Sequence, residues 1–246
     1  MSYQMITDHC ECHDYDGAVD GVVYRETALA SYRALKKQIG ALGEDEPCRL
    51  LCGVELGQPL QGLAAAEELV SRSYDFVLAS IHNITGYEDF YFWDYDQTSD
   101  GEIDRLLHQY FREILETVQW GHIDALAHLT YPMRYIVGEY KREISLEPHM
   151  AQIQEIFKTM IQKGIALEVN TAGFRQAIGR ASPDLPLLRQ YFALGGRLVT
   201  LGSDAHRIQD VGKGLPEGMA LLREAGFQSY AVYIDQKPCM IPILEA

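Results

Sequence analysis

The sequence predicts an α/β fold in which parallel strands and helices alternate to form a barrel. Short apolar runs and longer amphipathic segments alternate along the chain, which is the pattern of βαβ units. The length of 246 residues is ordinary for a barrel of this kind. Residues able to bind metal ions follow the apolar runs, and barrel enzymes hold their chemistry at the carboxyl ends of strands. We therefore expect a single barrel domain over residues 1–246.

Six apolar runs are the predicted strands of a parallel sheet. They are Tyr3–Thr7, Arg49–Val54, Phe76–Ser80, Ile123–Ala127, Ile165–Val169 and Leu198–Leu201. A further strand pair, Ser229–Ile234 and Lys237–Ile243, is expected near the C-terminus. The amphipathic segments predict helices over residues 24–39, 62–72, 101–119, 147–163, 184–194 and 214–225. Gly164 and Gly195 are the predicted stops of two of these helices, because glycine readily adopts the left-handed backbone of a C-cap.

One segment departs from this alternation. Residues 83–100, NITGYEDFYFWDYDQTSD, directly follow a predicted strand and are rich in aromatic and acidic residues. Long loops in compact domains are often functional. The same composition also fits a lid that packs on its own aromatic side chains, and the two interpretations are compatible.

The net charge limits the partners of the protein. A formal charge of −14 disfavours nucleic acid, because nucleic-acid binders need a basic surface. A small anionic substrate stays open, since arginines and metal ions in a site can outweigh the charge of the whole chain. No apolar run approaches the roughly 20 residues that span a membrane, and the N-terminus lacks the layout of a signal peptide. These observations predict a cytoplasmic protein without a membrane partner.

The ends of the predicted strands carry a repeated pattern of metal-binding residues. In chain order these residues are Asp8, His9, Glu55, His82, His128, Glu168, Asn170, Asp204 and His206. In a parallel barrel the carboxyl ends of the strands lie on one face and converge. A lone histidine at a strand end is more often an ordinary polar residue than a ligand, but repetition at six strands weakens that explanation. Imidazole and carboxylate groups around one mouth are typical of a site for Zn, Fe or Mn.

Glu55 and three arginines indicate the chemistry of such a site. A carboxylate can bridge two metal ions, and metals that lower the pKa of a bound water make hydroxide available near neutral pH. Arg175 and Arg207 adjoin strand-end motifs, and Arg134 lies in the segment HLTYPMRY. Guanidinium groups bind phosphate through two parallel hydrogen bonds. The residues therefore predict a metal-dependent hydrolase that acts on a phosphate ester.

Six short motifs occur in a fixed order along the chain, namely ITDHCE, GVE, ASIHN, ALAHLTY, EVNTAGFR and LGSDAH. Together they resemble the PHP (polymerase and histidinol phosphatase) family, and within it the histidinol-phosphatase branch. The resemblance runs from about residue 5 to residue 215. Each motif alone is weak, whereas all six in order at strand ends are specific.

The resemblance implies a distorted (β/α)7 TIM-like barrel that binds up to three ions of Zn, Fe or Mn. It implies hydrolysis of a small-molecule phosphate ester, L-histidinol phosphate, to L-histidinol and phosphate in histidine biosynthesis. The implied metal ligands are His9, Glu55, His82, His128, Asp204 and His206. Of these, Glu55, Asp204 and His206 are the predicted catalytic residues. The resemblance further implies that Arg175 and Arg207 hold the substrate phosphate, with Arg134 as a third candidate, and that loop 83–100 helps to close the pocket.

The resemblance also assigns the ligands to particular ions. It implies that Glu55 bridges two ions and that His82 and His128 complete the shell of the second. Asp204 would hold the first ion, and His9 and His206 would hold the third.

One part of the family pattern is missing from the sequence. Family members open on a strand that carries a His-x-His motif, but no His-x-His occurs here and the TDH motif lies at residues 7–9. We therefore expect the first strand–helix unit of the barrel to be absent, as in a shortened version of a longer protein or in a natural loss. An opened barrel has an exposed strand edge, where a second copy could pair to form a homo-oligomer.

Other functions stay open at this point. The same fold could hydrolyse a nucleotide or phosphotyrosine, and the missing motif leaves room for an inactive binding protein. An amidohydrolase-type barrel is disfavoured, because its first-strand His-x-His is also missing and no lysine stands at a predicted strand end.

Overall fold

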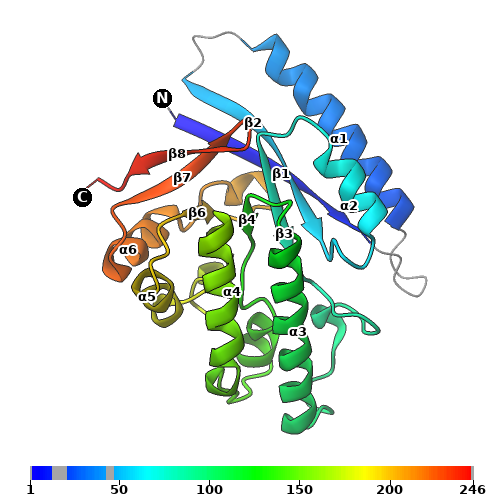
Figure 1. Cartoon of the computed structure of the whole chain (residues 1–246), viewed down its shortest axis with the longest axis vertical. Coiled ribbons are helices and arrows are strands. Elements are labelled where there is room, and N and C mark those ends of the chain that lie inside the picture. Colours follow the sequence, from blue (N-terminus) through cyan, green and yellow to red (C-terminus); the bar gives the residue numbers. More distant parts are fainter. Residues whose placement is uncertain (1, 13–20, 43–46, 245–246) are drawn as a thin grey trace.

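The computed structural model describes residues 2–12, 21–42 and 47–244. Six parallel strands form one sheet in the order β1 to β6, and an antiparallel hairpin of β7 and β8 lies beside it (Figure 1). The strands are β1 (Ser2–Glu11), β2 (Cys48–Gly57), β3 (Phe76–Ser80), β4 (Ala125–Leu126), β5 (Ala166–Asn170), β6 (Val199–Gly202), β7 (Ser229–Ile234) and β8 (Lys237–Pro242). The sheet curls into a half-barrel, which confirms the predicted α/β fold of the distorted TIM-like class.

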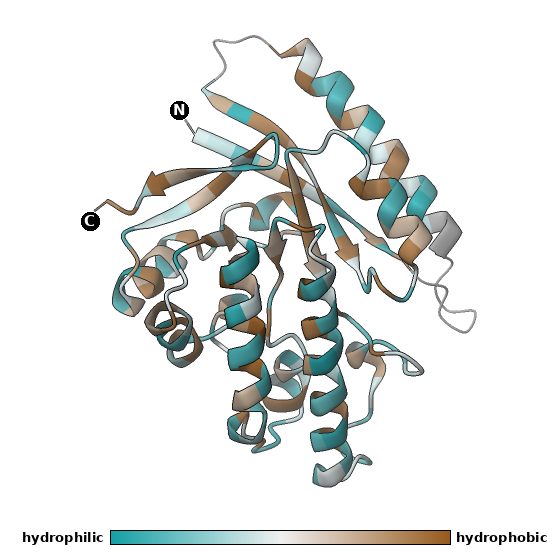
Figure 2. Ribbon diagram, in the orientation of Figure 1, coloured by the Kyte–Doolittle hydropathy of each residue, from teal (hydrophilic) through white to brown (hydrophobic). Residues whose placement is uncertain are grey.

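Helices connect successive strands and pack against the sheet. They are α1 (Gly21–Ala41), α2 (Leu63–Val70), α3 (Asp100–Trp120), α4 (Met150–Lys163), α5 (Leu185–Ala193) and α6 (Leu215–Ala225). Five short turns are also helical: η1 (Phe90–Phe92), η2 (Arg134–Glu139), η3 (Glu147–His149), η4 (Ala172–Arg175) and η5 (Ile208–Asp210). Figure 2 shows hydrophilic residues along the outward faces of α3 and α4, as expected for helices that bury the opposite face.

The predicted glycine stops are confirmed. The backbone is left-handed at Gly164, with φ of 71°, and at Gly195, with φ of 101°. None of the helices in the described part of the chain combines the length and the apolar character that crossing a bilayer requires.

The strands β1 and β2 extend beyond their predicted ends. The prediction ended the first strand at Thr7, with His9 just past its end, whereas β1 continues to Glu11 and pairs with β2 throughout. In this register His9 lies opposite Glu55, and Glu11 lies opposite Gly57. The predicted end was too early because the prediction stopped before the charged residue Asp8, although one face of a strand can line a polar site.

The sheet is open along one side. Within the described residues, neither the outer edge of β1 nor that of β6 pairs with another strand. A cavity of about 1050 Å³ lies there, lined by β1, β6 and the β7–β8 hairpin. The edge of β1 is therefore unpaired in this part of the chain, and pairing of a second copy at this edge stays a prediction.

Loop 83–100 packs on its own aromatic side chains, as one of its two interpretations predicted. Phe90 and Tyr95 are buried, and the Tyr95 hydroxyl donates to the Phe90 carbonyl at 3.1 Å. Tyr91 and Phe92 point outward and are 61% and 59% exposed. Arg142 fixes the end of the loop by donating to the Tyr95 carbonyl.

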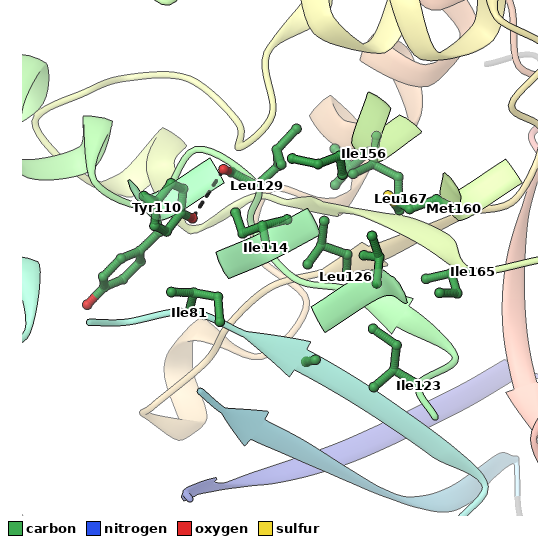
Figure 3. Close-up of a cluster of buried hydrophobic side chains, with 14 of the residues drawn as sticks. Ile81, Tyr110, Ile114, Ile123, Leu126, Leu129, Ile156, Met160, Ile165 and Leu167 are labelled. Carbon is green, nitrogen blue, oxygen red and sulfur yellow. Dashed lines mark hydrogen bonds between the residues drawn. The ribbon is translucent and has the colours of Figure 1, made fainter. Parts of the chain in front are cut away.

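A hydrophobic core joins the middle of the sheet to α3 and α4. Figure 3 shows Leu126 of β4 and Leu167 of β5 in one cluster with Ile114 of α3 and Met160 of α4. The neighbouring Tyr110 is also buried, and its hydroxyl donates to the Leu129 carbonyl at 3.1 Å. The core therefore anchors the chain just after β4, next to one of the predicted metal ligands.

Replacing Tyr110 with Phe is expected to lower the free energy of unfolding by about 1–2 kcal/mol, because the buried Leu129 carbonyl loses its donor while the ring packing stays. Urea denaturation followed by circular dichroism measures the change. An unchanged midpoint and slope would contradict this role of the hydroxyl.

Asp124 carries a partly buried carboxylate just before β4. Its Oδ2 accepts a hydrogen bond from the Val77 N–H at 2.7 Å, and burial raises the pKa of the carboxyl to about 6. The ordinary pKa of Asp is about 3.9. Because the pKa of Asp124 is higher in the folded state, the folded protein is more stable when this carboxyl is protonated. The contribution of Asp124 to the free energy of unfolding is complete below about pH 4 and is lost as the pH rises through about 6.

The variant Asp124→Asn keeps an oxygen that can accept from Val77 and removes the charge. We expect it to raise the free energy of unfolding by about 1–3 kcal/mol at pH 8 and to change it little at pH 4. Urea denaturation at both pH values tests this, and an equal gain at both would show that the charge is not the cause.

Candidate metal centre

The strands bring the predicted ligands to one end of the sheet. His9 of β1 and Glu55 of β2 lie directly opposite each other in the strand register. His82 and His128 follow β3 and β4, and Asp204 follows β6. The cavity beside β1 is lined by His9, Glu55 and Asp204. The predicted convergence at the carboxyl ends of the strands is therefore present in the structure.

Glu55, His82 and His128 form a compact triangle. Their facing atoms are Glu55 Oε1 and the two Nε2 atoms, which lie 3.4 Å (His82) and 3.3 Å (His128) from the oxygen. The two Nε2 atoms are 3.4 Å apart. Zn bonds of about 2.0–2.1 Å in a tetrahedral arrangement place neighbouring ligand atoms roughly 3.3 Å apart. The triangle therefore has the spacing of three ligands around one ion.

Burial and neighbouring charges act in opposite directions on the pKa values of Glu55 and His82. Burial alone would raise the pKa of the Glu55 carboxyl, but the hydrogen bonds and charges of His128 and His82 hold it well below its ordinary value. Burial alone would lower the pKa of His82, but Glu11 and Glu55 outweigh it and raise this pKa well above the ordinary value. A metal ion binds the neutral imidazole, so ion binding at His82 must release a proton.

Glu11 is a site residue that the sequence prediction missed. Its Oε1 lies 3.0 Å from Nδ1 of His9 and 2.9 Å from Nδ1 of His82. Residues two apart on a strand share a face, so the position of Glu11 two residues after His9 was an available signal. The prediction could not use it because it ended the strand at Thr7.

Glu168 is buried beside the triangle and holds the backbone of one ligand. Its Oε2 accepts from the His128 N–H at 2.9 Å. Burial, reinforced by the charges of Glu55 and Asp204, raises the pKa of Glu168 to about 8. A Cβ on Gly202 would come within 2.1 Å of Glu168 Oε1, so the absence of a side chain at this position makes room for the carboxyl.

Asp204 lies at the end of β6 in a left-handed turn with φ of 49°. Its Oδ2 accepts from Arg134 at 3.2 Å, and its Oδ1 lies 3.4 Å from Nδ1 of His206. The ring centres of His206 and His9 are 6.2 Å apart. The predicted pair His9 and His206 is therefore brought together, although more loosely than the triangle around Glu55.

The three predicted phosphate-binding arginines have different surroundings. Arg134 is paired with Asp204, whereas Arg175 donates to the Ser203 carbonyl at 2.7 Å and so ties down the loop after β6. Arg207 is exposed and lines the cavity. All three lie near the predicted ligands, and their role in binding phosphate stays a prediction.

Loop 83–100 reaches the centre through Asp89. The Asp89 carboxylate accepts from the Tyr131 hydroxyl at 3.1 Å. The Tyr131 ring centre lies 4.9 Å from the ring centre of His82 and 5.1 Å from that of His128. The Arg134 guanidinium lies over the Tyr131 ring, 5.1 Å from its centre. Tyr131 thus links the loop to the ligand histidines, although the sequence prediction did not select it.

The donor atoms fit a transition metal. Imidazole nitrogens and carboxylate oxygens suit Zn, Fe or Mn, and the triangle has the spacing that one such ion requires. Fold and site together define an α/β protein of the TIM-like barrel class with a candidate metal centre at the carboxyl end of its sheet. The model of the PHP domain family matches residues 1–172, and the chain belongs to this family.

The chain is similar to proteins named as phosphatases. A probable histidinol-phosphatase of Thermotoga maritima is 32% identical over 166 residues, which cover 68% of this chain and 63% of that protein. A probable histidinol-phosphatase of Clostridium acetobutylicum is 29% identical, with 67% and 63% covered. The matched part of the chain therefore spans about 63% of the length of either relative.

The fold is shared with a solved structure. The histidinol phosphate phosphatase of Lactococcus lactis, crystallised with Zn, L-histidinol and phosphate, superimposes with a TM-score of 0.71. The superposition covers 97% of this chain and 88% of that one, at 24% sequence identity. This likeness confirms the fold.

The triangle predicts the effect of removing one ligand. We expect His128→Ala to weaken the tightest zinc binding at least 100-fold, because two ligands remain of three. Titration against a chromophoric chelator measures the affinity. The exposed His122 provides a matched control, and His122→Ala should bind as the wild type does. Equal loss in both variants would contradict the assignment.

Proposed function

We propose that the protein is a metal-dependent phosphomonoester hydrolase that cleaves L-histidinol phosphate to L-histidinol and phosphate. The observation that carries the proposal is the triangle of Glu55, His82 and His128 at the carboxyl end of the sheet. Membership of the PHP family and the names of its relatives support the substrate. The Lactococcus lactis enzyme holds Zn, L-histidinol and phosphate on the same fold.

The proposed ligands fall into two groups. Glu55, His82 and His128 would hold one ion through atoms that already have ligand spacing. His9, Asp204 and His206 would hold the others, up to three ions of Zn, Fe or Mn in all, with Glu55 as a bridge. When bound, the ions would supply a hydroxide near neutral pH and neutralise charge on the phosphoryl oxygens.

The chain's own residues would position the reacting groups. Glu55 is kept ionised by two histidines, so its carboxylate is available as a ligand. His206 Nδ1 lies 3.4 Å from Oδ1 of Asp204, so these two proposed ligands are neighbours in the segment after β6. Arg207 lines the cavity and can turn to the phosphate. To bind phosphate, Arg134 would first have to leave the Asp204 carboxylate, and Arg175 would have to leave the Ser203 carbonyl.

Phosphate release tests the proposal. We expect the zinc-loaded protein to hydrolyse L-histidinol phosphate with a kcat/KM at least tenfold higher than for AMP or phosphotyrosine. A chelator should abolish the activity, and added metal should restore it. Glu55→Ala should lower kcat at least 100-fold, because the triangle loses its carboxylate.

The alternatives have separate outcomes in this experiment. A higher kcat/KM for AMP or phosphotyrosine would identify another phosphoesterase. Full metal content without turnover of any ester would identify an inactive binding protein.

A further inference from the structure

Glu11 is a buried carboxylate that belongs to neither proposed ligand group. Its side chain is 10% exposed. Its Oε1 lies within hydrogen-bond distance of two imidazole nitrogens, His9 Nδ1 at 3.0 Å and His82 Nδ1 at 2.9 Å. Oε2 accepts a hydrogen bond from the side-chain amide of Gln58. Both oxygens therefore face nitrogen atoms that can donate, which suits a carboxylate that only accepts hydrogen bonds.

The geometry separates an orienting role from a ligand role. His82 has two ring nitrogens, and its Nε2 already faces Glu55 and His128 at ligand spacing. Its Nδ1, the other ring nitrogen, is therefore not part of the triangle and lies at hydrogen-bond distance from Glu11 Oε1. A carboxylate on one ring nitrogen keeps the proton there and leaves the other nitrogen free to bind metal.

We propose that Glu11 is the positioning residue of the metal centre. It holds His9 and His82 with protons on Nδ1, so that both rings present Nε2 to metal ions. One carboxylate thus orients two ligand imidazoles that the chain delivers from different strands. The inference rests on the proposed metal-dependent function and adds a residue that does not itself bind the ions.

The surrounding residues hold this carboxylate in place. Gln58 donates to Glu11 through its side-chain amide, and its Oε1 accepts from the His82 backbone N–H at 2.7 Å. Gln58 itself has a left-handed backbone with φ of 46°. A Cβ on Gly57 would come within 2.3 Å of Glu11 Oε2, so a side chain there would push the carboxylate away.

Two kinds of variant test the proposal through metal affinity. Glu11→Gln keeps the volume but gives one acceptor oxygen for two imidazoles, and its amide opposes that of Gln58. Gly57→Ala keeps Glu11 and displaces its carboxylate. The exposed Glu67 provides the control Glu67→Gln. Folding of each variant is checked by circular dichroism.

The readouts are zinc affinity by chelator competition, bound zinc by elemental analysis, and histidine tautomers by ¹⁵N NMR of the zinc-loaded protein. We expect Glu11→Gln to weaken zinc binding 10- to 100-fold with the number of bound ions unchanged at saturation. Gly57→Ala should shift affinity in the same direction, and the control should not. In the wild type, His82 should be protonated at Nδ1, and part of this signal should move in Glu11→Gln.

Three results would overturn the inference. Loss of one bound ion at saturation would make Glu11 a ligand, and unchanged affinity in both Glu11→Gln and Gly57→Ala would remove its orienting role. A His82 ring protonated at Nε2 would reverse the assigned tautomer. Zinc binding by a wild type that releases no phosphate would defeat only the proposed function, whereas a wild type that binds no zinc would defeat both.

Discussion

The parallel register between β1 and β2 determines the geometry of the metal centre. Ten consecutive pairs along these strands place His9 opposite Glu55 and Glu11 opposite Gly57. Side-chain direction alternates along a strand, so a slip by one residue would turn His9 and Glu11 to the outer face. That face lies towards α1, where Asp8 accepts a hydrogen bond from the hydroxyl of Ser31. The contacts that orient the ligands therefore depend on backbone pairing along the full length of β1.

Two buried carboxylates serve the histidines in different ways. Glu11 lies at hydrogen-bond distance from two imidazole nitrogens, and its pKa is lowered, so it stays ionised. Glu168 accepts a hydrogen bond from the backbone N–H of His128, and its pKa is raised to about 8. Each carboxylate lies beside a glycine of a neighbouring strand, Gly57 or Gly202, where a Cβ would collide with it. The sheet thus makes room for buried carboxyl groups because a residue without a side chain lies next to each. Glycine here is a matter of space, because neither residue has a left-handed backbone.

The arrangement of elements could be predicted because it depends on periodicity. Apolar runs bounded by glycine and polar residues mark β3 and β5, and the prediction placed both close to their observed positions. Convergence of the ligands then follows from parallel topology alone. The end of β1 could not be found in this way, because His9 and Glu11 interrupt the apolar run while the backbone ladder continues. Polar residues on the inner face of a strand look like a loop when only hydrophobicity is considered.

Side-chain partners depend on distances that the order of residues does not contain. Arg175 adjoins the EVNTAGF segment and so invites a phosphate-binding role, yet its guanidinium reaches the Ser203 carbonyl across the loop after β6. Arg134 lies 70 residues before Asp204 and pairs with it. In both cases the arginine holds the segment that carries Asp204. A guanidinium that fixes a ligand loop and one that grips phosphate look the same in a sequence, because both need a cation at the carboxyl end of the sheet. The structure shows the contacts of Arg134 and Arg175 with the segment that carries Asp204, and phosphate binding by these arginines stays a prediction.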